Sequence, residues 1–366
     1  MDTMKKKEYG VGRSVREAQG VLGVLTRRGM VLRKAFQVVP LLLALVVFMV
    51  SSAFAAPEYS FKFAGQNPAD HPATAVMNQI AAEVAEKSNG RIELKVYPAN
   101  QLGDYTLVFE ELIRGTIEMG CISVPSQFDP RLELVYVNGF VRGYDDAKRV
   151  FAPDGWLFGK MDELISRLGV NLLGFFIEGM IGTGTTKPAV DPLNPAVAKE
   201  VLVRVPNMDV YKLAAEAMGY RTVTIPYADV YQAMQTGVCE GVNGYPVAAA
   251  YTALRDVLKH WYMTNYSLEC LNIMISGKTW ASMKPEDQKI LQDAVSRGAA
   301  KSIEMAEEVD AKYMQMMRDY GIEVHTYTQE QLTPLAEACA TTWQALEKNM
   351  TKELMDEFRV NMAPGK

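Results

Sequence analysis

Histidine and cysteine are scarce in this sequence. Its 366 residues include three histidines and four cysteines, with no C-x-x-C pair, no H-E-x-x-H segment and no histidine beside a cysteine. Metal centres and dithiol redox sites need such ligands at short, fixed spacings. The sequence therefore predicts neither a metal site nor a cofactor. The histidines are His71, His260 and His325, and the cysteines are Cys121, Cys239, Cys270 and Cys339.

Each cysteine lies in a stretch of apolar residues. We expect buried free thiols, because a free cysteine packs like a small apolar side chain. Pairing of one or two cysteines as disulfides is the alternative in an oxidising compartment.

Signatures of hydrolases and nucleotide-binding enzymes are missing as well. No G-x-S-x-G segment occurs, and the glycines of Gly179–Gly184 lack the spacing of a dinucleotide-binding loop. Lys187 follows two threonines but no phosphate-loop pattern. We interpret these glycines as turn and strand residues, and the chain as no enzyme of these classes.

Long hydrophobic runs are also absent. The apolar run from Val38 to Val50 has 13 residues, too few to span about 30 Å of hydrocarbon. Basic residues precede it and Ala53-Phe54-Ala55 follows it, as in an export signal cleaved after Ala55. A membrane anchor is the alternative, and Arg27-Arg28 leaves twin-arginine export open beside the general route.

Removal of residues 1–55 makes the protein more acidic. That segment holds nine of the 38 Lys and Arg residues but three of the 43 Asp and Glu residues. The remainder carries 29 positive and 40 negative charges, a net charge of −11. Such a surface repels nucleic acid and anionic lipid, so neither is an expected partner. Positive charge for binding an anion must then be local and buried.

The pattern of apolar residues predicts an α/β fold with two sheets. Residues 59–123 and 201–243 each read as strand, helix, strand, helix, strand. Such runs are typical of mostly parallel sheets covered by helices. The expected strands are 59–64, 91–97, 117–123, 201–205, 221–225 and 238–243, and the expected helices between them are 71–87, 105–114, 209–218 and 228–236.

Two further segments are long enough to connect these sheets. Residues 171–186 are extended, and 285–320 form a helix of about 54 Å that begins with Pro285 and ends before Gly321. Crossing segments of this kind are typical of a two-lobed clamshell. We expect lobe I at 57–184 plus about 267–305 and lobe II at 185–266 plus about 306–366, after a signal segment at 1–55.

Arg204 stands out because it interrupts an apolar strand, Val201 to Pro206. A buried guanidinium needs a partner. That partner is either a structural carboxylate or a ligand, and the strand alone does not decide between them. An arginine suits a carboxylate ligand because it donates two parallel hydrogen bonds.

At these residues the chain resembles the solute-binding receptors of TRAP (tripartite ATP-independent periplasmic) transporters. The order and spacing of several short segments carry the resemblance over essentially the whole chain after residue 55. They are Asn89-Gly90-Arg91-Ile92, Tyr97-Pro98, Gln101-Leu102-Gly103, Val203-Arg204-Val205-Pro206 and Pro226–Gly237. Val238-Cys239-Glu240-Gly241 departs slightly from the family pattern.

The resemblance implies a ligand site. It makes Arg204 the residue that forms a salt bridge with a substrate carboxylate. It also places Lys187 at a second cationic position and Tyr227 in the pocket wall. The other implied ligand residues are Asn243, Tyr245, Gln66, Asp104 and Ser123.

Ordinary structural roles remain open for several of these residues. Tyr227 suits a core position, Lys187 a solvated strand end and Asn243 a turn. Tyr245 is an additional aromatic residue that suggests a more apolar ligand than a short dicarboxylate. Glu269, a carboxylate in an apolar strand, suits either a hinge cation or a ligand hydroxyl.

The resemblance also implies the function. The chain is expected to be a periplasmic binding-protein-like clamshell that captures a small organic acid, as C4-dicarboxylate receptors do. It would deliver the acid to the membrane permease subunits of a TRAP transporter. A receptor for an ATP-driven importer, a ligand sensor for a signalling partner and an exported enzyme are the alternatives.

Overall fold

The computed structural model describes residues 56–362, and the chain from Pro57 onward forms one compact unit. The predicted export signal and its cleavage point after Ala55 lie outside the described residues. Within the described part, no helix combines the length and apolar character needed to cross a membrane.

The strands form one mixed sheet instead of the two separate sheets expected, because the crossing strand β4 pairs with strands of both halves. They follow the order β2-β1-β3-β9-β4-β7-β5-β6, while β8 pairs with β4 and β10 pairs with β8. The strands are β1 (Tyr59–Gly65), β2 (Ile92–Tyr97), β3 (Met119–Ile122), β4 (Val170–Thr185), β5 (Leu202–Val205), β6 (Arg221–Thr224), β7 (Gly241–Pro246), β8 (His260–Tyr262), β9 (Leu268–Ser276) and β10 (Glu323–His325).

Both predicted β-α-β-α-β runs are present. Strands β1, β2 and β3 are parallel to one another, as are β5, β6 and β7. The helices that connect them are α2 (Pro72–Lys87), α3 (Tyr105–Arg114), α6 (Asp209–Ala217) and α7 (Val230–Gln235). The predicted helix at 228–236 is divided, since its first residues form the short 3₁₀ turn η2 (Tyr227–Asp229).

Strand β4 joins two lobes. Its residues 170–180 pair with β9, and its residues 181–185 pair with β7. We call the half with β1, β2, β3 and β9 lobe I and the half with β5, β6 and β7 lobe II. All but one of the 16 residues of β4 are buried, so the strand runs through the core of both lobes. The crossing at 171–186 is thereby confirmed, whereas the residue boundaries of the lobes stay a prediction.

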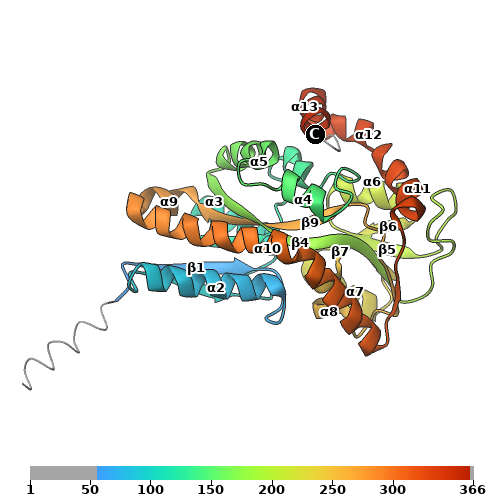
Figure 1. Ribbon diagram of the computed structural model, residues 1–366, viewed down its shortest axis with the longest axis horizontal. Helices are drawn as coiled ribbons and strands as arrows, with labels where there is room; N and C mark the ends of the chain where they lie inside the picture. The colour runs from blue at the N-terminus through green and yellow to red at the C-terminus, as the bar shows by residue number, and fades with distance from the viewer. Residues whose placement is uncertain (1–55, 363–366) are drawn as a thin grey trace, which may run out of the picture. The chain divides into compact units, whose positions relative to one another are not determined.

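Helix α10 (Pro285–Tyr320) matches the predicted helix to the residue. It packs on β4, on α2 in lobe I and on α8 (Val247–Leu254) in lobe II, so it spans both lobes (Figure 1). The fold is therefore the expected two-lobed clamshell. The remaining helices are η1 (Pro130–Tyr136), α4 (Tyr144–Val150), α5 (Trp156–Ser166), α9 (Gly277–Ser282), α11 (Gln329–Ala340), α12 (Trp343–Met350) and α13 (Lys352–Met362).

A glycine lets α10 approach β4 closely. Gly179 has a φ of +131°, and a Cβ there would lie 2.2 Å from Asp310 Oδ1. The short distance allows Asp310 Oδ2 to accept hydrogen bonds from Met180 N at 2.9 Å and from Tyr144 Oη at 2.5 Å. Burial raises the pKa of Asp310 to about 7. The junction between the lobes therefore depends on a glycine at this position.

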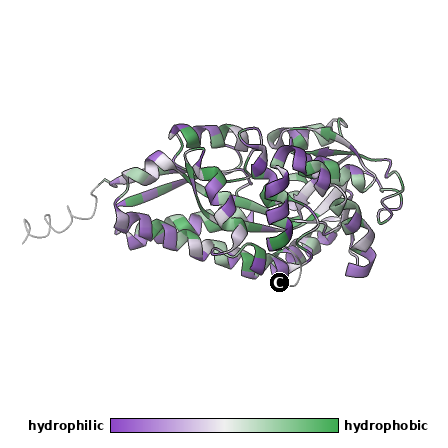
Figure 2. Cartoon of the chain, turned by 90° about the horizontal axis from the view of Figure 1, so that it is seen from above, coloured by the Kyte–Doolittle hydropathy of each residue, from purple (hydrophilic) through white to green (hydrophobic). Residues whose placement is uncertain are grey.

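Two apolar clusters make up the core. The smaller one lies in lobe I between α2, β1, β2 and the first half of α10, and the larger one fills the rest. Helices carry both hydrophobic and hydrophilic residues, as expected for helices that cover a sheet (Figure 2). All four cysteines are buried and unpaired, which confirms the expectation of free thiols.

Candidate functional site

Arg204 is the third residue of β5 and is 2% exposed. Its Nε donates to the carbonyl of Ile225 at 2.8 Å, and its guanidinium carbon lies 5.6 Å from the centre of the Tyr245 ring. Among the ion pairs of residues 56–362, none includes Arg204. No carboxylate of the described residues therefore lies within ion-pair distance of this guanidinium, which favours the ligand hypothesis over the structural one.

The guanidinium lines a small pocket between the two lobes. Its cavity of about 30 Å³ has room for about two water molecules, whereas ligand pockets usually hold about 300 Å³ or more. The cleft is therefore closed in this structure, and a solute enters only when its walls move apart. The lining residues are Gln66, Tyr105, Ser123, Tyr136, Glu178, Arg204, Pro206, Met208, Tyr211, Tyr227, Gly244, Tyr245, Pro246, Ala249 and Glu269.

Glu178 of β4 is a buried acid at this pocket. Its Oε1 accepts a hydrogen bond from Asn67 Nδ2 at 2.6 Å and lies 3.5 Å from His71 Nε2. His71 Nδ1 accepts from Ala73 N, so the proton of the neutral ring is on Nε2. Burial raises the pKa of Glu178 to about 8 and lowers the pKa of His71 to about 3. Near pH 7 both groups are mostly uncharged.

Glu269 of β9 is the second buried acid of the pocket. Tyr211 Oη donates a hydrogen bond to its Oε2. Burial and the neighbouring Glu178 hold the pKa of Glu269 well above its usual value, although Tyr211 and Arg204 lower it. The pocket thus combines one guanidinium with two carboxyl groups that resist ionisation.

Aromatic rings form much of the wall. The rings of Tyr227 and Tyr245 stack with their centres 5.5 Å apart and 12° between their planes. Tyr227 Oη donates to Asn67 Oδ1 at 2.9 Å, which links lobe II to lobe I across the cleft. The other tyrosines of the pocket are Tyr105, Tyr136 and Tyr211.

Five of the predicted ligand residues meet at this pocket. Arg204, Tyr227 and Tyr245 come from lobe II. Gln66 and Ser123 come from lobe I, where Gln66 Oε1 accepts from Ser123 N at 2.8 Å and Gln66 Nε2 donates to Ser123 Oγ at 3.2 Å. Their direct contact with a ligand stays a prediction.

Two predicted residues lie elsewhere because nearer partners hold them. Lys187 Nζ pairs with Glu240 Oε1 at 2.6 Å, and its side chain is 45% exposed. Asp104 caps helix α3, where Oδ1 accepts from Thr106 N at 3.2 Å, and it lines a neighbouring groove between the lobes that shares Tyr105 with the pocket. Neither residue reaches the pocket around Arg204.

Asn243 is also absent from the pocket wall. It is fully buried in β7, where Nδ2 donates to Thr183 Oγ1 at 2.8 Å and Oδ1 accepts from Tyr266 Oη at 2.6 Å. Both ends of its amide are therefore bound within lobe II. The side chain holds β7 to β4 and does not line the pocket.

The sequence did not assign the two acids of the pocket. Glu178 and Glu269 each interrupt an apolar strand, which is the same signal that identified Arg204. Three tyrosines were missed because an aromatic residue among apolar neighbours looks like core; they are Tyr105, Tyr136 and Tyr211.

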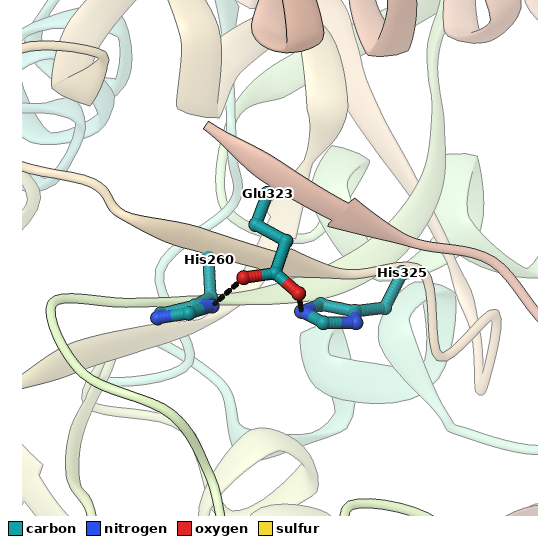
Figure 3. A group of neighbouring side chains, drawn as sticks. All are labelled: His260, Glu323 and His325. Atoms are coloured by element: carbon teal, nitrogen blue, oxygen red, sulfur yellow. Dashed lines mark ion pairs between the residues drawn. The ribbon is translucent and has the colours of Figure 1, made fainter. Parts of the chain in front are cut away.

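The histidines that are dispersed in the sequence are not all separate in space. His260 and His325 lie on either side of Glu323 on the paired strands β8 and β10 (Figure 3). These three residues are the only group among residues 56–362 with ligand atoms close enough to share a metal ion. None of them lines the pocket around Arg204.

A two-lobed α/β clamshell with a polar pocket between its lobes defines a class of proteins, the receptors that enclose a small solute. The sequence profile described as "Bacterial extracellular solute-binding protein, family 7" matches residues 63–349. The chain belongs to this family, the solute-binding receptors of TRAP transporters, which confirms the resemblance. The family consists of periplasmic receptors.

Relatives of known name agree with this assignment. The chain is 24% identical to the sialic acid-binding periplasmic protein SiaP of Vibrio cholerae over 284 residues, which cover 76% of this chain and 85% of the relative. It is 25% identical to the C4-dicarboxylate-binding periplasmic protein DctP of the same organism over 321 residues, which cover 86% and 94%.

Solved structures share the fold. A TRAP periplasmic solute-binding protein from Sulfurospirillum deleyianum with bound succinate superposes with a TM-score of 0.75 at 20% identity, covering 83% of this chain and 99% of that one. One from Haemophilus influenzae with bound L-gulonate gives a TM-score of 0.74 at 21% identity, with the same coverage.

Proposed function

We propose that this receptor captures a small organic acid in the pocket between its lobes and delivers it to the permease subunits of a TRAP transporter. Arg204 binds the carboxylate of the solute. The observation that carries this proposal is a buried guanidinium at the interlobe pocket with no ion pair among the described residues. Burying an unpaired charge is costly, so the site is built for an anion that arrives with the ligand.

The lobe I side of the pocket limits which chemical groups the rest of the solute can have. Glu178 and Glu269 are buried carboxyl groups with raised pKa values, and this wall offers no cation to pair with a second carboxylate. Hydroxyl or ammonium groups of a solute would instead donate hydrogen bonds to these acids. A monocarboxylic acid with donor groups at its far end, such as a sugar acid or an amino acid, suits the pocket better than a short dicarboxylate.

Closure is part of the proposed binding mechanism. The cavity of about 30 Å³ is far smaller than such an acid, so the lobes must separate to admit it and close around it. Exclusion of water then strengthens the charge-assisted bonds from Arg204. Lobe I at 57–184 plus about 267–305 and lobe II at 185–266 plus about 306–366 would move as the two bodies.

Export completes the proposal. The basic and apolar residues of 1–55 would direct the chain to the periplasm and be removed after Ala55. N-terminal sequencing of protein from the native envelope should begin at Ala56 or within a residue or two. Uncut protein in the cytoplasm would contradict this step.

A ligand screen tests the function directly. Thermal unfolding should be followed with propionate, 3-hydroxypropionate, β-alanine and succinate, which differ only in the group at the far end, and with gluconate, which has several hydroxyl groups. A true ligand at 100 times its Kd stabilises by about 2.7 kcal/mol, and we expect hydroxy or amino acids to exceed propionate and succinate. Failure of every carboxylate, including larger sugar and aromatic acids, to raise the melting temperature would overturn the proposal.

The alternative functions have separate readouts. Neighbouring genes that encode membrane subunits alone favour a TRAP permease, whereas a neighbouring ATPase gene favours an ATP-driven importer. Chemical change of a bound acid, followed by nuclear magnetic resonance, would indicate an exported enzyme that uses the acids of the pocket.

A further inference from the structure

Two short parallel strands bring distant residues together in lobe II. In the register of β8 and β10, Glu323 lies beside His260 and His325 lies beside Tyr262. Residues two apart on a strand share a face, so Glu323 and His325 of β10 face the same side as His260 of β8. Figure 3 shows the carboxylate between the two imidazole rings.

The distances between these groups suit a shared ion. His260 Nδ1 lies 3.3 Å from Glu323 Oε2, and His325 Nε2 lies 3.6 Å from Glu323 Oε1. All three ligand atoms lie within 4.8 Å of one another. Bonds of about 2.0 to 2.1 Å in a tetrahedral zinc site place neighbouring ligand atoms about 3.3 to 3.4 Å apart.

The two ring nitrogens that face Glu323 lack hydrogen-bond partners among the described residues. His260 Nδ1 and His325 Nε2 are shielded from solvent, and neither makes a hydrogen bond to any described residue. A direct hydrogen bond from either ring to Glu323 would need a shorter and straighter approach. Glu323 thus lies within ion-pair distance of both rings, and the facing nitrogens have no hydrogen-bond partner, which leaves all three groups available to a shared metal ion.

We propose that His260, Glu323 and His325 bind one divalent transition-metal ion of the zinc type. Two imidazoles and one carboxylate are a common ligand set for Zn²⁺, with water in the fourth position. The Glu323 side chain is 66% exposed, which gives the ion a path from solvent.

The surroundings prepare the imidazoles for this role. The His325 ring stacks on Tyr262 with their centres 4.5 Å apart and 5° between their planes, which fixes its orientation.

The position of the site gives it a structural consequence. Strand β10 follows α10 after only two residues, Gly321 and Ile322, and β8 also pairs with β4. An ion that joins β8 to β10 therefore fastens the end of the spanning helix to lobe II. Because folding assembles the ligands, metal binding should stabilise this lobe without occupying the solute pocket.

Titration of the metal-free processed protein with Zn²⁺ by calorimetry tests the site. We expect one ion per chain, a rise in melting temperature with added Zn²⁺, and affinity at least about tenfold weaker in His260→Gln and in Glu323→Gln. Glu330→Gln, which changes an exposed carboxylate on the neighbouring helix α11, is the matched control and should bind like the wild type.

The double variant His260→Gln/His325→Gln makes the test decisive. It leaves His71, which is buried, as the remaining histidine of the chain. Loss of the Zn²⁺-dependent rise in melting temperature, with the melting temperature of the metal-free protein nearly unchanged, would support the site. Undiminished binding by this variant, or no binding by the wild type, would overturn the proposal.

Discussion

Lobe I and lobe II face each other across the pocket with different chemistry. Lobe I contributes the acids Glu178 and Glu269, whereas lobe II contributes Arg204 and the stacked pair Tyr227 and Tyr245. One side therefore attracts a carboxylate and the other accepts hydrogen bonds. This difference favours a single orientation of the solute, with its acid group toward lobe II and its donor groups toward lobe I.

Removal of the cation should have the largest effect. Arg204→Ala leaves a ligand carboxylate without its charged partner, which typically costs about 2–5 kcal/mol, roughly a 30-fold to several-thousand-fold loss of affinity. Arg204→Lys should recover little of the lost affinity, since an ammonium cannot donate two parallel hydrogen bonds to the carboxylate. Calorimetric titration with the best acid from the screen measures both variants.

The stability of the empty receptor is the control for Arg204. The variant removes one hydrogen bond, to the carbonyl of Ile225, so the unliganded protein should lose only about 1 kcal/mol. A variant that melts far below the wild type yet binds normally would assign Arg204 a structural role instead.

The buried carboxyl group of Glu178 should make the stability of the protein depend on pH. Glu178 binds its proton more tightly when folded, with a pKa of about 8, than when unfolded, near 4.5. Between these values the folded state holds more protons, so stability is greatest at low pH and falls as pH rises from 5 to 8. The loss is on the order of 4 kcal/mol at most. Glu178→Gln should flatten this part of the profile in urea unfolding.

An exposed acid provides the comparison for that experiment. Glu216→Gln changes a carboxyl group on the surface and should leave the slope between pH 5 and pH 8 as in the wild type. Equal slopes in wild type and Glu178→Gln would mean that the Glu178 carboxyl is ionised in the folded protein.

The hydrogen bond that joins the two lobes across the pocket should contribute less to the affinity for the acid. Tyr227→Phe removes the bond to Asn67 Oδ1 and keeps the stack on Tyr245. We expect the closed form to lose about 1 kcal/mol and the affinity to fall about fivefold. Tyr231→Phe, at an exposed position, is the control, and an unchanged affinity in Tyr227→Phe would show that this bond does not favour closure.

Replacement of Lys187 should have the smallest effect on the affinity for the acid. Its ion pair with Glu240 is exposed, and such pairs contribute at most about 1 kcal/mol. Lys187→Ala and Glu240→Gln should therefore both bind the acid within about twofold of the wild type. A tenfold loss in Lys187→Ala alone would mean that this lysine reaches the ligand when the lobes move.

The elements that the sequence predicted best carry local signals. Pro285 and Gly321 mark both ends of α10, and alternating apolar residues mark the two β-α-β-α-β runs. The insertion of β9 between β3 and β4 has no such signal, because pairing partners of a strand lie far away in the chain. The same limit explains why the sequence did not predict that His260 and His325 lie close together, since β8 and β10 are separated by the whole of α10.

The sequence indicates candidate site residues where a residue conflicts with its surroundings. Arg204 in an apolar strand is such a conflict, and Glu178 and Glu269 are others that the sequence left unassigned. Lys187 and Asn243 lie outside the pocket because they are held by Glu240 and Thr183, which lie 53 and 60 residues away in the sequence. The linear sequence does not show which polar side chains already have a hydrogen-bond or ion-pair partner in the fold.

The central place of β9 has a consequence for how the chain reaches its native state. Strands β3 and β4 both pair with β9, which comes about 150 residues after β3 ends. A chain that emerges from a membrane channel with its N-terminus first would expose the edges of β3 and β4 until Leu268–Ser276 arrives. Unpaired edges invite aggregation, and distant pairing slows folding. Lobe I should therefore complete its sheet only after Leu268–Ser276 has become available for pairing.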